Sequence, residues 1–144
     1  MLKPLTLATT LAAAGAFGTA QAHELGFAGL LSKGNKEELP EINLSSGKPL
    51  GDDMVLKSGT AYELEISSDG SAELQLAGAG FFRAIWINEV VINDLEVRPF
   101  GIESLEFDDE GTMEIEFVAI KPGTYELKIP GTTSENQRIK ITIK

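Results

Sequence analysis

The chain has a single histidine, His23, in the stretch GTAQAHELGF. The three residues before it, Ala20-Gln21-Ala22, have the small-x-small pattern of a signal-peptidase site, and cleavage there makes His23 the first residue of the mature chain. A terminal histidine offers Cu(II) its α-amine and its imidazole in one chelate, and copper favours such tetragonal nitrogen sites. We therefore take His23, with Glu24 beside it, as the candidate metal site and copper as the candidate cofactor. The alternative is that His23 only marks the end of the signal, because the chain has no second histidine to complete the ligand set.

A second chemistry open to this sequence is carboxylate catalysis, because 22 residues are Asp or Glu. A glycosidase mechanism needs only a pair of carboxylates, and Trp86 would then serve as a substrate platform. The acids that alternate with apolar residues are Glu63, Glu65, Glu114 and Glu116. This alternation more simply predicts a solvated sheet face, so we expect no catalytic residues and no enzyme. A concave pocket holding two of these acids would favour the enzyme.

Two acidic runs raise the question of Ca²⁺, which takes about six to eight oxygen ligands. They are Asp52-Asp53 and Asp108-Asp109-Glu110. The second run lacks the spaced ligand pattern of a calcium loop and is better interpreted as an acidic hairpin turn.

The aromatic residues Phe81, Phe82 and Trp86 offer a platform for a sugar or a partner, but aromatic side chains within an alternating run usually belong to the core.

Composition excludes several classes of protein. The absence of cysteine rules out disulfides, thiolate metal sites and a cysteine nucleophile, and a sole histidine near the end of the mature chain argues against a serine triad. The net charge is −10, and it becomes more negative if Lys3 is lost with the signal. Nucleic acid and anionic membranes are therefore poor partners, whereas a cation or a basic protein face is a better one.

The first residues have the parts of a secretory signal: Lys3, an apolar run from Leu5 to Phe17, and small residues before the cut. This run is too short to span a bilayer, and no other apolar stretch approaches that length. We expect residues 1–22 to be a signal peptide, residues 23–144 to form one domain, and the protein to be secreted into the periplasm without a membrane span.

From about residue 40 the apolar residues recur with a period of two, which predicts strands with one face in the core. The clearest runs are TAYELEISS, GTMEIEF, GTYELKI and RIKITIK, and weaker ones are AELQL, AIWIN, LEVRP and SLEFD. Residues 32–51 are interpreted as an edge strand flanked by loops, and GAGFFRAIW as containing a short helical turn. About seven to nine short strands separated by turn residues predict an all-β Greek-key sandwich.

The segment IESLEFDDEGTMEIEFVAIKPGTYELKIPG, Ile102 to Gly131, resembles the C-terminal half of bacterial periplasmic cupredoxin-like domains, and LKSGTAYELEISS resembles an earlier strand of that family. The resemblance implies a cupredoxin-like Greek-key β-sandwich. Members that bind copper take Cys, His and commonly Met from the last hairpin loop, together with a histidine from mid-domain. This chain has IPGTTSENQR at the matching place, so the resemblance does not extend to the type 1 copper ligands.

Three functions are compatible with these observations. The first is an exported cupredoxin-like binding or accessory protein that acts through protein–protein interaction with another exported protein. The second is a periplasmic copper-handling protein that uses the processed His23. The third is an exported enzyme based on paired carboxylates.

Overall fold

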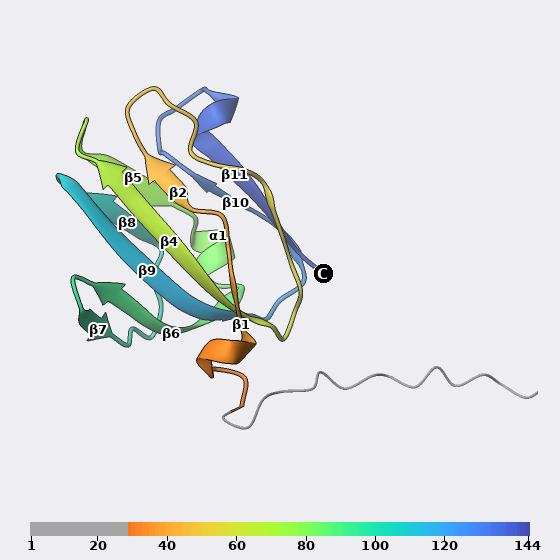
Figure 1. Cartoon of the computed structure of the whole chain (residues 1–144). Coiled ribbons are helices and arrows are strands. Elements are labelled where there is room, and N and C mark those ends of the chain that lie inside the picture. Colours follow the sequence, from red (N-terminus) through yellow and green to blue (C-terminus); the bar gives the residue numbers. More distant parts are fainter. Residues whose placement is uncertain (1–28) are drawn as a thin grey trace, which may run out of the picture.

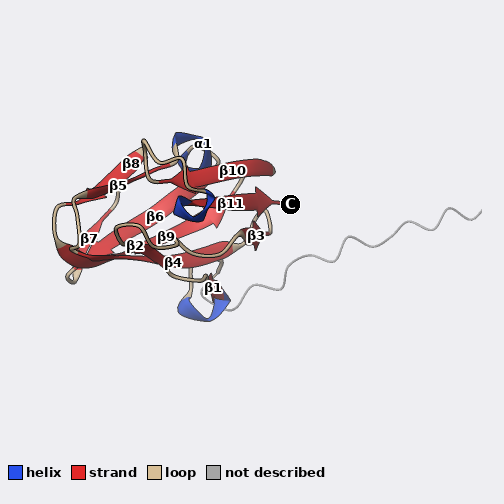
Figure 2. Ribbon diagram, turned by 90° about the horizontal axis from the view of Figure 1, so that it is seen from above, coloured by secondary structure: helices blue, strands red, loops and turns tan. Residues whose placement is uncertain are grey.

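The computed structural model describes residues 29–144, which form an all-β sandwich of two sheets (Figures 1 and 2). The larger sheet has six strands: β1 (Lys36–Glu38), β2 (Ile42–Leu44), β4 (Ala61–Asp69), β6 (Ile85–Ile92), β7 (Leu95–Val97) and β9 (Glu110–Ala119). The smaller sheet has five: β3 (Met54–Leu56), β5 (Leu74–Ala77), β8 (Ser104–Phe107), β10 (Gly123–Lys128) and β11 (Arg138–Ile143). Three short helices complete the fold: η1 (Lys33–Asn35), α1 (Ala79–Phe82) and η2 (Glu135–Gln137). The sandwich predicted from the alternating pattern is thus confirmed.

The larger sheet is centred on β9, which pairs antiparallel with β4 on one side and with β6 on the other. β7 follows β6 at one edge, through a hairpin whose turn residues Asn93 and Asp94 both have positive φ. Such a turn matches the twist of the strands, and Asn and Asp tolerate it better than most residues do. In the smaller sheet the order is β3-β11-β10-β5-β8, so β7 and β8 lie at edges of different sheets.

The expectation of one edge strand within residues 32–51 is wrong, because two short strands run parallel to β4 along the same edge. β1 pairs with Ala61–Glu63 and β2 pairs with Ile66–Ser68. Pro40 lies between them and has no N–H to donate to a sheet, so the edge is interrupted there. Together with the three-residue β3, this division raises the number of strands above the seven to nine expected.

The core lies between the two sheets and is built from the inward residue of each alternating pair. Tyr62, Leu64 and Ile66 of β4 face Phe117, Ile115 and Met113 of β9 in register, and all six are buried. The helical turn expected in GAGFFRAIW is confirmed as α1, which inserts Phe81 edge-on against Phe117 with ring centroids 5.6 Å apart. Phe81 and Phe82 therefore belong to the core, as predicted.

Within residues 29–144, no helix is long and apolar enough to cross a membrane.

Candidate functional site

The outer face of the larger sheet carries the acidic residues that alternate with the core. Three strands present them in register, so that Glu63 of β4, Glu116 of β9 and Glu89 of β6 form one row across the sheet. In the next outward row Glu65 lies opposite Glu114. The prediction that the four acids share one sheet face is therefore confirmed.

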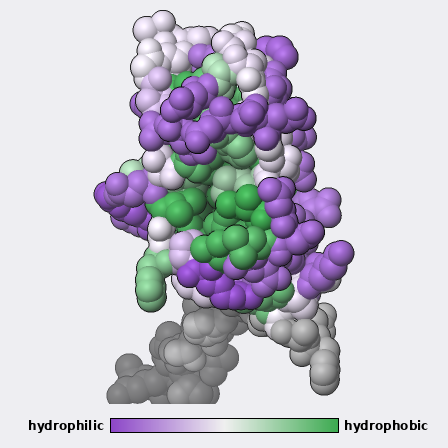
Figure 3. Space-filling view, turned by 90° about the vertical axis from the view of Figure 1, so that its left-hand side faces the viewer, coloured by the Kyte–Doolittle hydropathy of each residue, from purple (hydrophilic) through white to green (hydrophobic). Residues whose placement is uncertain are grey.

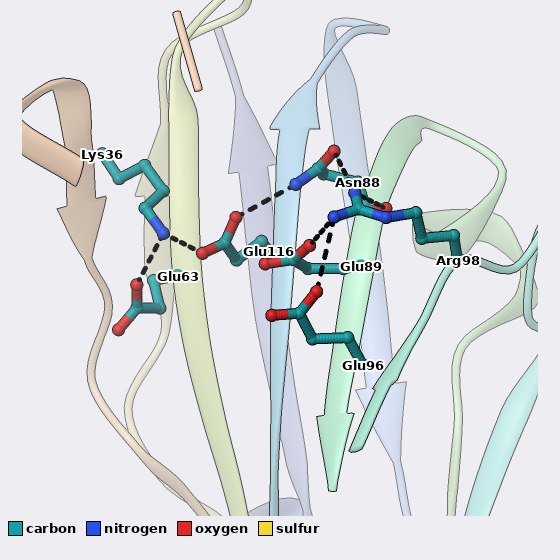
Figure 4. Close-up of polar contacts among 7 residues, drawn as sticks. All are labelled: Lys36, Glu63, Asn88, Glu89, Glu96, Arg98 and Glu116. Atoms are coloured by element: carbon teal, nitrogen blue, oxygen red, sulfur yellow. Dashed lines mark hydrogen bonds and ion pairs between the residues drawn. The ribbon is translucent and has the colours of Figure 1, made fainter. Parts of the chain in front are cut away.

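The prediction that these acids form a solvated sheet face is wrong for Glu116, which is only 7 % exposed. Lys36 of β1 extends over β4 and forms ion pairs with Glu116 and with Glu63, the latter at 3.1 Å (Figure 4). The Asn88 side-chain amide donates a hydrogen bond to the second carboxylate oxygen of Glu116 at 3.1 Å. The Lys36 side chain is itself only 11 % exposed. A buried ion pair is tolerated when further hydrogen bonds satisfy its members, and here both oxygens of Glu116 have partners.

A second charged network adjoins the first on the side of β7. The Arg98 guanidinium contacts Glu89 at 2.7 Å and Glu96 at 3.5 Å, and it also donates to the side-chain oxygen of Asn88 at 3.2 Å (Figure 4). Asn88 therefore joins the two networks. It lies at a bulge between Ile87 and Glu89, where an extra residue in β6 directs its side chain toward both of them.

Glu114 lies beside the Lys36 network without entering an ion pair of its own within the described chain. The carboxylate oxygens of Glu63, Glu114 and Glu116 come within 4.8 Å of one another. Partial burial raises the pKa of Glu114, the charge of Glu63 raises it further, and Lys36 only partly opposes this. These acids line a hollow of about 390 Å³ together with Lys33, Lys36 and Glu38.

This hollow contains acids in one concave pocket, which is the geometry that the enzyme alternative requires. A raised pKa on one carboxylate beside other acids also resembles an acid–base pair. However, Lys36 already pairs with Glu63 and Glu116, and Asn88 holds the remaining oxygen of Glu116. Glu63 and Glu116 therefore form an ion cluster compensated from within the chain, whereas Glu114 lies beside this cluster without a cation of its own among the described residues.

An apolar hollow lies on the same outer face, at the end of the sheet next to η1. Its volume is about 470 Å³, and it is lined by Leu30, Leu31, Trp86, Val118 and Ile120. Trp86 pairs directly with Val118 across β6 and β9 and is 51 % exposed, while Ile120 is 52 % exposed. The expectation that Trp86 belongs to the core is therefore wrong. The side chain points outward because Ile85 and Ile87, its neighbours in β6, take the inward positions opposite Ala119 and Phe117.

A second apolar area lies along β7 and the chain on either side of it. Ile92, Leu95, Val97 and Phe100 are all well exposed there. Figure 3 views this side of the molecule and shows a hydrophobic area between hydrophilic margins. The area adjoins the β6–β7 hairpin, whereas the Trp86 hollow adjoins η1.

The two acidic runs have ordinary structural roles. Asp53 accepts a hydrogen bond from the Lys140 backbone N–H at 2.8 Å and pairs with its ammonium at 3.2 Å, and these contacts hold the pKa of Asp53 below its usual value. Asp109 accepts from the Glu110 N–H at the turn between β8 and β9, in keeping with an acidic hairpin turn. Asp108 instead lies close to Glu73 and Glu106 in an exposed cluster.

The loop that matches the copper-ligand loop of cupredoxins joins β10 to β11 and includes η2. Its side chains bond to one another, as in the 2.7 Å contact from Thr132 to Gln137. Residues 29–144 contain neither histidine nor cysteine, and both of their methionines, Met54 and Met113, are buried in the core. These donors do not fit a type 1 copper centre. The candidate ligands His23 and Glu24 lie outside the described residues.

Four features of this face were missed by the sequence analysis: Lys36, Asn88, Arg98 and the apolar hollow. Lys36, Asn88 and Arg98 escaped notice because a lone polar residue in a short or irregular segment carries no periodic signal. The apolar hollow did leave a signal: the run Phe117-Val118-Ala119-Ile120 does not alternate, so the end of β9 must be apolar on both faces.

Comparison with known proteins gives structural matches only. No protein-family model matches the chain, and no curated protein matches its sequence. A crystal structure of a multicopper oxidase superposes with a TM-score of 0.56 at 6 % identity, covering 81 % of this chain and 46 % of that one. A multicopper oxidase from Pseudomonas parafulva gives a TM-score of 0.56 at 14 % identity, covering 77 % of this chain and 31 % of that one. The fold is a cupredoxin-like β-sandwich.

A laccase-like multicopper oxidase from Ochrobactrum sp. has a TM-score of 0.50 at 10 % identity, covering 69 % of this chain and 23 % of that one. The chain therefore spans less than half the length of these cupredoxin-like enzymes. At such low identity the match concerns the fold alone.

Proposed function

We propose that this chain is an exported, periplasmic cupredoxin-like module that binds another exported protein through the outer face of its larger sheet. The observation that carries the proposal is the half-exposed Trp86 in an apolar hollow, beside which the next outward row of the sheet is acidic. Tryptophan is enriched among the residues that dominate protein–protein binding energy, and a contiguous exposed apolar area commonly marks an interaction site. The polar margin around an apolar centre is also typical of protein interfaces.

Photo-crosslinking in the native host tests this proposal. A photoreactive phenylalanine analogue at Ile120 should give a discrete product of higher mass, and Trp86→Ser should abolish it. Val55→Ser is the matched control, because Val55 is an exposed apolar residue on the smaller sheet. A product that survives Trp86→Ser, or no product that depends on the Ile120 position, contradicts the proposal.

Export has a separate test. Cleavage after Ala22 predicts that the protein recovered from the periplasm begins with His23, as read by N-terminal sequencing. A chain that still begins at Met1 and remains in the cytoplasm would contradict export.

A second candidate function is copper handling through the processed His23, with Glu24 as an additional ligand. The feature that favours it is the sequence Ala20-Gln21-Ala22 directly before His23, because cleavage after Ala22 would create an amine–imidazole chelate. Stoichiometric Cu(II) binding, with nitrogen couplings in the electron paramagnetic resonance spectrum, should disappear in His23→Ala and when one residue is added before His23. Copper affinity that survives the added residue would show that the terminal chelate is not the site.

Glu63 and Glu116 have no catalytic role in this function. The reason is the internal compensation of Glu63 and Glu116 by Lys36.

A further inference from the structure

The apolar hollow and the acidic rows form one continuous surface. The register of β9 and β6 places Val118 and Trp86 side by side at the hollow, and the buried Ala61 of β4 pairs with Val118 on its other side. The next outward row is Glu63, Glu116 and Glu89, and the row after it is Glu65, Glu114 and Val91. Outward rows in a sheet follow one another at a spacing of about 7 Å, because every second residue faces the same side. The carboxylates therefore begin about 7 Å from the apolar row and continue to about 14 Å.

The acidic rows oppose like charges across neighbouring strands. Glu63 faces Glu116, Glu116 faces Glu89, and Glu65 faces Glu114. Directly opposed like charges destabilise a sheet. Solubility does not require this arrangement, because acidic and basic residues alternating across the strands would keep the face equally soluble. Lys36 and Arg98 compensate part of the first row, but neither Glu65 nor Glu114 enters an ion pair within residues 29–144. The pKa of Glu114 is raised because burial and the neighbouring carboxylates Glu63 and Glu65 all disfavour its charged form.

We infer that this surface binds a protein segment in which one large apolar side chain is followed by lysine or arginine residues. The apolar side chain fills the hollow beside Trp86, and a basic side chain reaches Glu65 and Glu114, the two acids of the surface that form no ion pair within residues 29–144. In an extended segment this basic residue is the fourth after the apolar one, because that spacing matches the rows. A basic residue two positions after the apolar one lies over the row of Glu63, Glu116 and Glu89, which Lys36 and Arg98 already pair, so it adds only attraction to the net negative charge of the surface. The inference rests on the proposed protein-binding function and specifies the chemistry of the partner.

Charge favours this occupant over the alternatives. The chain carries a net charge of −10, so an anionic lipid surface or a nucleic acid would be repelled. A second copy of the chain would bring two sets of the same unpaired carboxylates together. A basic segment instead supplies the cations that Glu65 and Glu114 lack, and it relieves the repulsion between them.

The test uses three synthetic seven-residue peptides and nuclear magnetic resonance of the ¹⁵N-labelled mature protein. The first peptide is Gly-Phe-Gly-Lys-Gly-Lys-Gly, the second has glutamate in place of both lysines, and the third has glycine in place of phenylalanine. We expect saturable shifts at the Trp86 indole and at the Val118 and Glu114 amides with the first peptide alone. Raising NaCl from about 20 to about 300 mM should weaken this binding about fivefold, because the ionic contacts are exposed.

Variants separate the charge contribution from the apolar one. The double substitution Glu65→Gln/Glu114→Gln should weaken the first peptide about tenfold and leave the fold unchanged, as judged from the same spectra. The matched control is Glu110→Gln, because Glu110 lies on the same strand and face but opposite Asp69, beyond the acidic rows of the surface. Equal binding of the acidic peptide, shifts confined to another face, or no shift at about 5 mM peptide would overturn the inference.

The outcome also distinguishes this inference from the proposed function. A crosslinked partner that depends on Trp86, but binds independently of salt and of the glutamine substitutions, leaves the function standing and overturns the basic-segment inference. A partner that is captured equally by Trp86→Ser overturns the function itself. Concentration-dependent dimerisation that Trp86→Ser abolishes would identify the occupant as a second copy and overturn both.

Discussion

Lys36 is the residue on which the buried part of the acidic face depends. It pairs with Glu116 and Glu63, and its side chain is almost fully covered. Lys36→Met leaves Glu116 as a nearly buried carboxylate without a cation, so we expect the free energy of unfolding to fall by about 3 kcal/mol. Urea denaturation followed by Trp86 fluorescence measures the change.

Lys33 provides the control for this prediction, because it lines the same hollow and is exposed. Lys33→Met should change the free energy of unfolding by less than about 0.5 kcal/mol. If Lys33→Met and Lys36→Met lower the free energy of unfolding equally, Lys36 contributes only one positive charge to an acidic surface, and its ion pair with the buried Glu116 adds nothing further.

Glu114 gives a prediction about pH. Its folded-state pKa lies above its ordinary value of 4.5, so ionising it in the folded protein costs stability as pH rises through the folded-state pKa. Glu114→Gln should therefore stabilise the protein at pH 7, and the gain should vanish below about pH 4, where the carboxyl is protonated in both the folded and the unfolded state. Thermal melts of both proteins across this range measure the difference. A gain that grows as pH falls would contradict the assigned direction.

At the scale of elements, α1 and β10 approach each other closely at Gly78. A Cβ added at Gly78 would collide with the Cδ2 atom of Leu127 and lie 3.1 Å from the Glu126 carbonyl oxygen. Because Leu127 is fully buried, it has no free space into which to move. Gly78→Ala should therefore destabilise the protein by about 1–3 kcal/mol in chemical denaturation.

Gly80, two residues further on in α1, is the control. A Cβ there would meet only Tyr125 at an ordinary contact distance of 3.8 Å. Gly80→Ala should be neutral or slightly stabilising, since alanine is the better helix former. Similar losses at both positions would mean that the helical turn, and not the contact with Leu127, limits the substitution.

The elements also show how far sequence reasoning extends. The long strands β4, β10 and β11 and the first part of β9 follow from uninterrupted alternation, and α1 follows from its interruption. The pairing of β1 with β4 does not follow from the sequence, because it joins segments about 25 residues apart through parallel backbone contacts. Lys36 reaches Glu116 only through that pairing. The outward position of Trp86 depends likewise on the partner strand β9, although the unbroken apolar run at the end of β9 already indicated a second apolar face.

At the scale of the whole molecule, the carboxylates Glu65 and Glu114, unpaired within the described chain, lower the stability of the fold, and the same carboxylates are expected to raise the affinity for a basic partner. Glu65 is exposed and faces Glu114 across β4 and β9, so Glu65→Lys replaces a repulsive pair with an attractive one. We expect the substitution to raise the free energy of unfolding by about 0.5 kcal/mol and to reduce its dependence on salt. Denaturation at low and high NaCl measures both effects. The same substitution should weaken a basic partner, because it places a cation where the partner's own cation would lie.

These two effects have opposite signs, which makes the variant informative. If this face serves only solubility, Glu65→Lys should stabilise the protein without changing its affinity for the basic peptide. If the face binds a basic partner, the same substitution should stabilise the protein and weaken that affinity. Glu110→Lys is the control on the same face, because Glu110 faces Asp69 beyond the acidic rows of the surface, where Lys48 already pairs with Asp69 at 3.3 Å. It should leave peptide binding unchanged. If Glu65→Lys stabilises the protein and still binds the basic peptide with full affinity, the opposed carboxylates do not serve the partner.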